Sequence, residues 1–366
     1  MFGLMVMAVT AARANTFTVT TTADHAVNAC DGECTLRDAI AAAGSNDTIV
    51  FGATITGTIA LASGELTVNK NLTIAGPGAR VLTVSGNSAS RILYVTSGVT
   101  VAISGLSFAN GYLANTTSGP TVLGGAAVFN QGTLSLTACA FTSNAVKLVD
   151  VNNGSFSVAA RADGGAISND FFAVIRLRDC MVSFNSVEAS TALGAGLFNQ
   201  GHAVLINTTF SSNTLKPGGS SRTASGGGIY TRYNKSSLVA ANCTIYGNTY
   251  AESIGGADYV ACGGICVEAG APVILQNTIV AGNTAPSASP DVGGEFTSRG
   301  HNLIGDTSGS TGWISTDQTG KSVASLHLTG LINNGGPTNT HAPQPGSIAI
   351  DMGAAELAMD PGPDRI

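Results

Sequence analysis

A module that recurs five times constrains the fold of this chain more than any other feature of the sequence. Each copy opens on glycines and reaches a closing asparagine about twenty residues later, whereas successive closing asparagines are separated by 28 to 41 residues. A constant module with a variable insertion is typical of a solenoid whose coils carry loops on one side. The openings are GGAAVFN at 124, GGAISN at 164, GAGLFN at 194, GGGIYT at 226 and GGICVE at 263, and the closing residues are Asn144, Asn185, Asn213, Asn248 and Asn283.

The positions inside each module alternate as two strands joined by a corner require. Counted back from the closing asparagine, the third, fifth, eighth and tenth places are apolar or small in every copy, as at Leu136, Leu177 and Leu205. This period-two pattern, broken once, predicts inward-facing columns that stack coil on coil at ~4.8 Å. The predicted fold is therefore all-β: a right-handed parallel β-helix, or solenoid, with one continuous apolar core.

Glycines and asparagines mark the corners between these strands. Gly227 and Gly264 stand where a Cβ would clash or where φ must be positive. Six residues before the closing asparagine, the last three modules carry Asn207, Asn242 and Asn277, and asparagine tolerates the left-handed backbone that a corner needs. We predict structural roles for these residues, with stacked amides bonded along the rod.

The two ends of the predicted rod differ from its middle. In the N-terminal cap, Thr35 as N-cap and Asp38 three residues later predict a short amphipathic helix that covers the first coil. Such caps are needed because an open β-helix exposes strand edges and apolar surface. We divide the chain into a signal peptide at 1–14, an N-terminal cap at 15–48, β-helix coils at 49–290, and C-terminal coils with a loop-rich cap at 291–366.

Composition limits the partners and the location of the protein. Only 10% of residues are charged, the net charge is -6, and Lys and Arg form no cluster, so we expect no nucleic-acid partner. Residues 1–14 form a short apolar run with a small-x-small ending, which predicts export; a buried N-terminal strand is the alternative. No other stretch reaches the ~18 apolar residues of a membrane-spanning helix. We therefore expect a secreted or cell-surface monomer without a transmembrane segment.

Seven cysteines in an exported chain suggest disulfides. Cys30 and Cys34 flank a glycine-containing turn, so the sequence allows them to pair locally. Cys262 and Cys266 are harder to join, because an extended strand would hold them about 13 Å apart. No second Cys or His pair stands at zinc spacing, so we predict no metal site. The other three cysteines, Cys139, Cys180 and Cys243, are expected to pack as small apolar residues in an inward column. A disulfide between Cys139 and Cys180 on adjacent coils is the alternative.

The repeats and both ends of the chain resemble a known group of bacterial proteins. The stretch CTLRDAI at 34–40 is similar to the CSLREA motif of exported β-helix proteins, and residues 331–354 resemble the end of the choice-of-anchor Q family. The GGA/I and FxxN signatures are similar to the repeats of polymorphic outer-membrane proteins. The resemblance implies a secreted or displayed right-handed parallel β-helix that is adhesin-like. It supplies no catalytic residues to carry over.

The alternative function is that of a polysaccharide lyase or glycoside hydrolase, since the same fold hosts such enzymes. The chain lacks the Asp-Asp pair of pectin hydrolases, and a lyase would need a Lys or Arg base, often beside calcium held by carboxylates. The candidate side chains are scattered along the sequence, so we identify no catalytic site. We expect no cofactor; calcium would be needed only if the protein were a lyase. These side chains belong to Arg161, Asp163, Arg176, Arg178, Arg232 and Lys235.

Tyrosines on two adjacent modules suggest the function. Aromatic rings on a flat sheet stack on sugar rings, although aromatic ladders also stabilise β-helices that bind no ligand. Insertions at 145–162, 214–225 and 249–262 leave the coil on one side, where recognition loops are usual. We predict an adhesin-like or glycan-binding rod that contacts a polysaccharide or a glycan of a host or neighbouring cell. The predicted ligand-binding residues are Tyr230, Arg232, Tyr233, Tyr246, Tyr250 and Tyr259.

Overall fold

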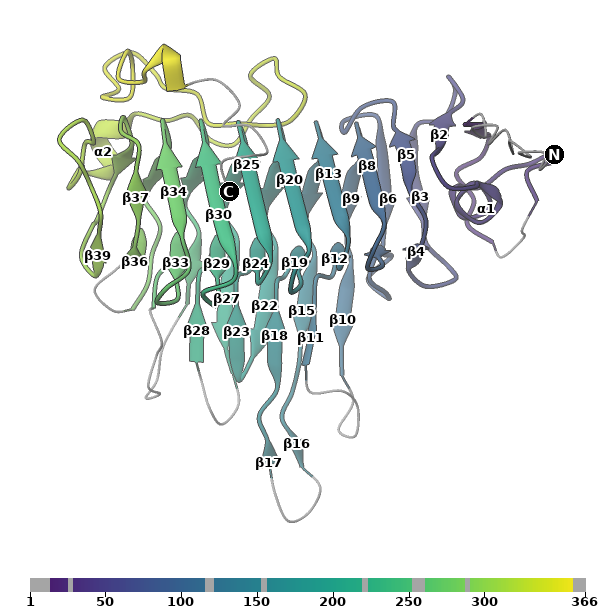
Figure 1. The fold of residues 1–366 in the computed structure, drawn as a ribbon, viewed down its shortest axis with the longest axis horizontal. Coiled ribbons are helices and arrows are strands. Elements are labelled where there is room, and N and C mark those ends of the chain that lie inside the picture. The colour runs from purple at the N-terminus through teal and green to yellow at the C-terminus, as the bar shows by residue number, and fades with distance from the viewer. Residues whose placement is uncertain are drawn as a thin grey trace, which may run out of the picture.

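The structure is a right-handed parallel β-helix that carries a fin on one side (Figure 1). Three long parallel sheets, named A, B and C, form the sides of the rod, and each coil passes from C to A to B. The fold class that the sequence predicts is therefore confirmed. The structure is a computed structural model that describes residues 14–25, 29–115, 122–152, 157–218, 223–251, 261–286 and 290–357.

The three long sheets take one strand from each coil. Sheet A contains β1 (Thr16–Val19), β2 (Asp47–Phe51), β5 (Leu72–Ala75), β8 (Thr100–Ser104), β13 (Thr133–Thr137), β20 (Val174–Arg178), β25 (His202–Ile206), β30 (Ser237–Ala241), β34 (Val273–Gln276) and β37 (Thr297–Ser298). Sheet B contains β3 (Gly57–Ala60), β6 (Leu82–Ser85), β9 (Ser107–Ala109), β14 (Ala140–Thr142), β21 (Met181–Ser183), β26 (Thr209–Ser211), β31 (Thr244–Tyr246), β35 (Ile279–Ala281) and β38 (Leu303–Ile304). Sheet C contains β4 (Leu66–Val68), β7 (Leu93–Val95), β12 (Val128–Asn130), β19 (Ile167–Asn169), β24 (Leu197–Asn199), β29 (Ile229–Thr231), β33 (Ile265–Val267), β36 (Val292–Glu295) and β39 (Ser310–Thr311).

Equivalent side chains lie over one another along the axis of the rod. Leu136 pairs in register with Leu177, and Leu177 with Leu205, across three neighbouring strands of sheet A. All three are at most 1% exposed and belong to one core that extends from Val19 to Ile304. In-register parallel pairing causes this stacking, because it places the same position of every coil on the same line.

The corner between sheets A and B has a left-handed residue in each module. Asn207, Asn242 and Asn277 have φ of 48°, 56° and 48°, as the sequence predicts, and the Asn277 amide donates to Asn242 at 3.2 Å. Ala138 and Asp179 hold the same place with φ of 54° and 55°. The corner is therefore imposed by the coil as a whole, and asparagine adopts it at a lower cost than most other residues that have a Cβ.

The corner that opens sheet C depends on glycine for close approach. A Cβ on Gly227 would overlap the carbonyl oxygen of Gly263 in the next coil, and one on Gly264 would overlap the carbonyl oxygen of Asp291. Both predicted structural glycines are thus needed because neighbouring backbones touch there, and not because of positive φ.

The closing asparagines form a second ladder inside the rod. The side-chain amides of the first four members donate to the side-chain oxygen of the equivalent asparagine in the next coil, at 2.8 to 2.9 Å, and that of Asn283 donates to the Asp291 carboxylate at 2.8 Å. These buried amides are paired on every coil, so the corner from which the fin leaves is rigid. The members of this ladder are Asn144, Asn185, Asn213, Asn248 and Asn283, all at most 4% exposed.

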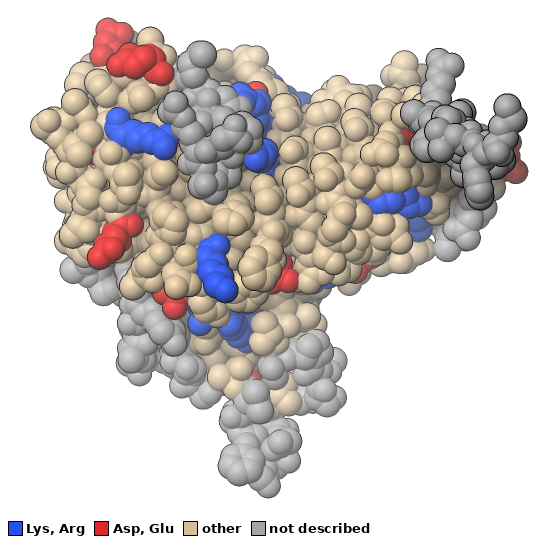
Figure 2. All heavy atoms as spheres, in the orientation of Figure 1, with Lys and Arg blue, Asp and Glu red and all other residues tan. Residues whose placement is uncertain are grey.

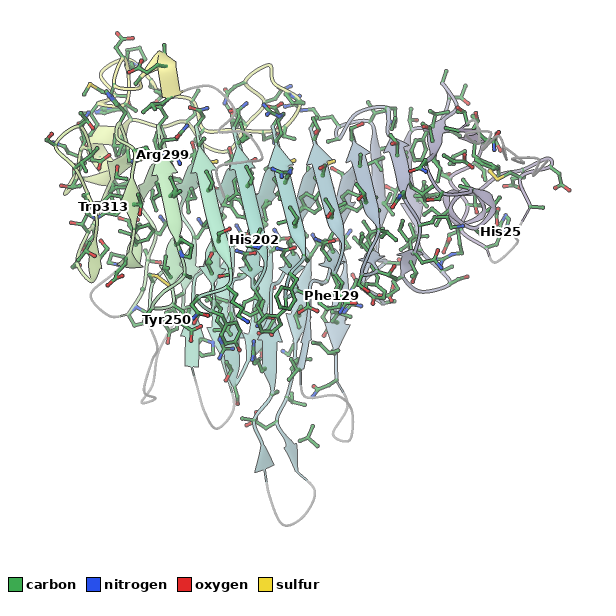
Figure 3. The ribbon with its side chains drawn as sticks, viewed as in Figure 1. His25, Phe129, His202, Tyr250, Arg299 and Trp313 are labelled. Atoms are coloured by element: carbon green, nitrogen blue, oxygen red, sulfur yellow. A yellow bond between two sulfur atoms is a disulfide. The ribbon has the colours of Figure 1, made fainter. Side chains whose placement is uncertain are left out.

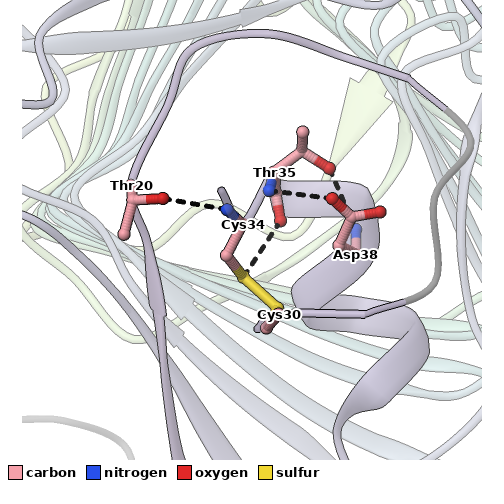
Figure 4. The surroundings of a disulfide bond; sticks show 5 residues. All are labelled: Thr20, Cys30, Cys34, Thr35 and Asp38. Atoms are coloured by element: carbon pink, nitrogen blue, oxygen red, sulfur yellow. Dashed lines mark hydrogen bonds between the residues drawn. A yellow bond between two sulfur atoms is a disulfide. The ribbon is translucent and has the colours of Figure 1, made fainter. Parts of the chain in front are cut away.

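A short helix covers the first coil, as predicted. Helix α1 (Leu36–Ala42) begins at Thr35, whose hydroxyl accepts from the Asp38 backbone while the Asp38 carboxylate accepts from the Thr35 backbone. Figure 4 shows this capping box beside the Cys30–Cys34 disulfide, with the Cys34 N–H donating to Thr20 at 2.9 Å. The pairing of Cys30 with Cys34 that the sequence allows is therefore present, and it ties the start of α1 to the chain that precedes it.

The described parts of the insertions between sheets B and C include paired strands, and these strands make the fin (Figure 1). One fin sheet, named D, contains β10 (Tyr112–Ala114), β15 (Ala145–Lys147), β22 (Ser186–Ala189), β27 (Thr214–Pro217) and β32 (Thr249–Tyr250). The other, named E, contains β11 (Val122–Gly124), β18 (Arg161–Asp163), β23 (Thr191–Leu193) and β28 (Thr223–Ser225), and a hairpin of β16 (Val151–Asn152) and β17 (Ser157–Val158) projects beyond both.

The fin has a core of its own. Ala162, Ala192 and Ala224 lie in register on sheet E, in one buried cluster with Val187 and Leu215 of sheet D. Small residues on one sheet and branched residues on the other allow the two sheets to pack closely. The described strands on this flank, where loops were expected, therefore form two packed layers.

The chain after the last coil folds back along the rod. It includes α2 (Val323–Leu326) and the short helix η1 (Ala355–Leu357). We call residues 327–357 the C-terminal strap: Arg80 donates to the Gly336 carbonyl, Thr338 donates to the Asp179 carbonyl, and His341 contacts Ser211 at 2.9 Å. The strap thus crosses coils that are far apart in sequence. Within the described ranges, no helix is long and apolar enough to cross a membrane.

Candidate functional site

Sheet C carries a column of large side chains on its outer face, next to the fin. Successive coils place Tyr94, Phe129, Ser168, Phe198 and Tyr230 in register on this face. The first two aromatic residues are half-buried and stacked, with ring centres 5.6 Å apart, whereas the last two are at most 1% exposed. Figure 3 shows Phe129 where the fin meets the rod. The column is therefore open to solvent over its first coils and closed over the later ones.

Three aromatic side chains stand beside the closed part of the column, and we call them the aromatic ledge: Phe171, Phe172 and Tyr233. Phe171 and Phe172 are 44% and 76% exposed, in the turn from β19 to β20. The rings of Phe171 and Tyr233 stack at 5.1 Å, although one whole coil lies between their turns. The ledge is thus assembled by tertiary structure and presents a large apolar surface to solvent.

The backbone of the ledge is strained. Phe172 and Tyr233 have φ of 61° and 73°, in the left-handed region that bulky residues rarely adopt. Such strain costs on the order of 1 to 3 kcal/mol at each residue and clusters at ligand sites. Phe172 recovers little of this cost by burial, because most of its ring is exposed.

Charged groups in pairs surround the ledge. Arg161 pairs with Asp163 at 2.8 Å and lies over the ring of Phe198, while Arg232 pairs with Glu268 at 3.2 Å and lies over the ring of Tyr233. The backbone N–H of Tyr233 donates to the same Glu268 carboxylate at 3.2 Å. The ledge therefore has donors and acceptors side by side, each held by a partner.

Burial changes the titration of the Arg161–Asp163 pair. Burial raises the pKa of the Asp163 carboxyl, and the guanidinium of Arg161 offsets only part of that rise. Burial alone would lower the pKa of Arg161, but the facing carboxylate outweighs it and the pKa is raised. The pair is a partly desolvated ion pair at the base of the fin, where an electrostatic interaction is stronger than in water.

The structure separates most of the tyrosines that the sequence groups together. Tyr230 is 1% exposed beneath Leu193 and Phe198, and Tyr250 is 2% exposed in the core of the fin (Figure 3). Tyr246 lies on sheet B against His341, with ring centres 4.9 Å apart.

Only Arg232 and Tyr233 of the predicted ligand-binding residues lie at the ledge, and Tyr259 is outside the described residues. The tyrosines therefore do not share one exposed sheet face, as the sequence analysis expected. Tyr230 is buried against Leu193 of the fin, and Tyr250 belongs to the core of the fin itself.

Phe171 and Phe172 are the functional candidates that the sequence analysis missed. Two other coils turn from sheet C to sheet A through the short segment Asn-Gln-Gly, at 130–132 and 199–201, whereas this coil has Asn-Asp-Phe-Phe-Ala at 169–173. The insertion of two aromatic residues at this turn is the signal in the sequence that distinguishes them. An alignment on the closing asparagines does not bring it out, because the turn lies outside the columns that recur in every module.

The cysteines fall into two disulfides and three buried thiols. Cys262 and Cys266 are joined, with their Cα atoms 5.7 Å apart, which corrects the expectation that they are hard to close: the chain turns between them at two glycines instead of running straight. Cys139, Cys180 and Cys243 are free and at most 2% exposed, as an inward column requires. Burial raises the pKa of the Cys243 thiol to about 12. This thiol is therefore unsuited to nucleophilic chemistry at neutral pH.

One arrangement outside the ledge has the form of a catalytic pair. The Nε2 atom of His341 lies 2.9 Å from the Ser211 hydroxyl, within hydrogen-bond distance. The Nδ1 atom of the same ring lies 2.7 Å from the Thr329 carbonyl oxygen. Ser211 is only 1% exposed and lies under the C-terminal strap, so a substrate has no access to the hydroxyl. The pair anchors the strap to sheet B.

Three hollows of the described chain lie away from the ledge. Hollows of about 110, 350 and 450 Å³ occur at the C-terminal coils, beside α1, and next to Asp291, and residues of the ledge line none of these three. Among the residues that the structure describes, no three His, Cys, Asp or Glu side chains come together as a metal site would require. Figure 2 shows that the visible face is mostly uncharged, with only scattered Lys, Arg, Asp and Glu.

Fold and site together define a parallel β-helix with a lateral fin and an exposed aromatic surface in the angle between fin and rod. No family model matches the chain, and no curated protein matches it. The inference of function therefore rests on the residues of the ledge.

Proposed function

We propose that this protein is a secreted or surface-displayed rod that binds glycans through the aromatic ledge. The observation that carries the proposal is a group of exposed rings: Phe172, which is 76% exposed with φ of 61°, lies beside Phe171, whose ring stacks on Tyr233. Such a group contributes little to folding, which favours a role in contacting a ligand, whereas a single exposed ring does not.

The chemistry around the ledge suits a sugar. Aromatic rings supply apolar contact for the C–H faces of a pyranose, and the Arg161–Asp163 and Arg232–Glu268 pairs supply donors and acceptors for its hydroxyl groups. The ledge rests on a rod and fin that are both rigidly packed, so little conformational entropy is lost when a ligand binds. We propose no cofactor for this binding.

The test is a glycan array probed with the wild-type protein, a double variant of the ledge and a control variant. We expect the Phe171→Ala, Phe172→Ala double variant to lose about tenfold or more in retention, the change that ~1.4 kcal/mol produces. Phe184→Ala is the matched control, because Phe184 is also exposed, at 56%, and has φ of 57°, but follows a strand of sheet B. Retention by the double variant equal to that of Phe184→Ala would contradict the proposal.

Catalysis is the competing function and needs a separate measurement. Incubation of the wild-type protein with acidic and neutral polysaccharides, followed by reducing-end and unsaturated-sugar assays, separates binding from lyase or hydrolase activity. We expect no turnover at the ledge, because Arg161 and Arg232 are each paired with a carboxylate and are not free to act as a base. Robust turnover that is lost in an Arg161→Met variant would favour the enzyme.

We also propose export, on the basis of residues 1–14 and of the cysteines. Two disulfides suit an oxidising compartment. The CSLREA-like and choice-of-anchor Q-like motifs support the same location, and membership of that group remains a proposal. Fractionation of the producing cells with an antibody against the protein checks it, and recovery from the cytoplasm alone would overturn it.

A further inference from the structure

We infer that the ligand is an uncharged, linear polysaccharide that lies lengthwise along the rod, from the stacked pair Tyr94–Phe129 to the aromatic ledge. This inference rests on the proposed function and adds to it the class of glycan, its direction and its minimum length. Three observations carry it: the balance of charge, a second aromatic group, and a continuous polar connection between the two groups.

The arginines along this path are neutralised by carboxylates, and one further carboxylate, Asp170, lies on it. Each of its three arginines is paired with a carboxylate, at 2.7 to 3.2 Å: Arg91 with Glu65, Arg161 with Asp163, and Arg232 with Glu268. An acidic polysaccharide would have to break these pairs to reach the guanidinium groups, and it would leave the carboxylates facing its own charge. A neutral sugar instead uses the free donor and acceptor positions of both partners without disturbing them.

The second aromatic group lies at the open end of the sheet C column. Tyr94 and Phe129 are half-buried, their rings stack at 26°, and Arg91 lies over the Phe129 ring at 5.1 Å from its centre. This arrangement of ring and paired arginine is the one found at the ledge, where Arg232 lies over Tyr233 at 4.6 Å. The same contact chemistry is therefore present twice on the same side of the rod.

Hydrogen-bonded side chains connect the two groups. The Tyr94 hydroxyl donates to Gln131 at 2.5 Å, and the Gln131 amide donates to Asp170 at 2.8 Å. Asp170 also accepts from the backbone N–H of Phe171, the first residue of the ledge, at 2.8 Å. The two aromatic groups are thus parts of one continuous surface.

The register of the coils sets the length of the ligand. Tyr94 and Tyr233 belong to coils that are four inter-coil steps apart, through β7, β12, β19, β24 and β29. At ~4.8 Å per step this is ~19 Å along the rod. A disaccharide is too short to reach from Tyr94 to Tyr233, the outermost rings of the two groups, whereas a hexasaccharide spans them.

Calorimetric titration with defined oligosaccharides tests the inference. The probes are hexasaccharides of glucose, xylose and mannose, hexasaccharides of galacturonate and mannuronate, and the disaccharide of each. We expect at least one neutral hexasaccharide to bind about tenfold or more tightly than its disaccharide and than either acidic hexasaccharide. An acidic hexasaccharide that binds more tightly than every neutral one overturns the neutral class.

Two double variants locate the ligand. Tyr94→Ala, Phe129→Ala should weaken the hexasaccharide about tenfold and leave the disaccharide unchanged, whereas Phe171→Ala, Phe172→Ala should weaken both. Equal binding of the hexasaccharide by the wild type and by Tyr94→Ala, Phe129→Ala overturns the lengthwise path while the proposed function stands. Failure of every glycan to bind the wild type overturns the proposed function and the inference together.

Folding of the variants is checked independently. Phe184→Ala serves again as the control for loss of an exposed ring, and thermal melts followed by circular dichroism compare all proteins. A Tyr94→Phe, Phe129→Tyr exchange preserves the aromatic stack, so it should bind the hexasaccharide within about threefold of the wild type. Its failure to do so, in a folded protein, would contradict a stacking role for the pair.

Discussion

Buried asparagines decide the geometry of each coil at the scale of single residues. Asn213 is fully buried, and its side-chain oxygen accepts both from the Asn185 backbone at 3.1 Å and from the Asn185 amide at 2.8 Å. Its own amide donates to the Val182 carbonyl at 2.9 Å and to Asn248 at 2.8 Å. One side chain therefore satisfies groups on three successive coils, which an apolar residue of the same size does not do.

Asn213→Ala should be among the most destabilising single substitutions. It leaves the Asn185 donors and the Val182 carbonyl without partners in a buried place, at about 1 to 3 kcal/mol for each unsatisfied group, so we expect a loss of ~3 kcal/mol in unfolding free energy. Urea denaturation followed by circular dichroism measures it. Asn207→Gly, at an exposed corner with φ of 48°, is the control and should change stability by less than about 0.5 kcal/mol. Comparable losses in the two variants would contradict this account of the buried ladder.

At the scale of elements, the junction of sheet E with sheet C depends on the ion pair in β18. Asp163 is 7% exposed, and burial raises the pKa of its carboxyl despite the neighbouring Arg161. A carboxyl whose folded pKa lies above its unfolded pKa binds protons more tightly when folded. Its ionised form therefore costs stability at neutral pH, and that cost is largest when no cation faces it.

Arg161→Met should destabilise the protein by about 3 kcal/mol at pH 7, whereas Asp163→Asn should cost much less. The loss in Arg161→Met should shrink as the pH falls toward about 4, because protonation of Asp163 removes the buried charge. Denaturation midpoints measured across this range check the trend. Lys147→Met is the control, since the Lys147–Glu188 pair on sheet D is 51% and 43% exposed and contributes little. A pH-independent loss in Arg161→Met would exclude the uncompensated carboxylate as its cause.

At the scale of the whole molecule, the C-terminal strap ties separate coils together. Arg80 of an early coil and Ser211 of a middle coil both contact it, through Gly336 and His341 respectively. Such contacts link coils that otherwise interact only with their immediate neighbours, so the strap increases the cooperativity of a rod whose stability is nearly one-dimensional.

The strap should loosen in mild acid. Burial lowers the pKa of His341 below its ordinary value of 6.5, so the unfolded chain takes up a proton first. The stability that neutral His341 contributes is complete above about pH 6.5 and is lost as the pH falls toward the folded pKa. Hydrogen exchange of residues 327–357, corrected for intrinsic rates, should accelerate between about pH 7.5 and 5.5 in the wild type and not in His341→Phe. His202→Phe on sheet A is the control, and loss of the pH dependence there would contradict the assignment to His341.

The sequence by itself determined the coil. Its apolar columns, exemplified by Leu136, Leu177 and Leu205, and its corner asparagines recur at fixed distances from the closing asparagine, so local pattern was sufficient to predict the stacking of sheets A, B and C. The helix at 36–42 was predictable for the same reason, and the Cys30–Cys34 pair was a possibility that the sequence allowed, since both depend on neighbours within four residues.

Only the tertiary structure decided the fin, the strap and the ledge. Whether an insertion is a loop or a strand depends on the insertion stacked beside it, as Ala162 on Ala192 shows, and the spacing of these insertions varies from coil to coil. Tyr230 was predicted to bind a ligand because it lies near other tyrosines on two adjacent modules, but its ring is buried against Leu193 of the fin. Phe171 and Tyr233 are 62 residues apart in sequence, and they meet because the turn of the coil between them is too short to separate them.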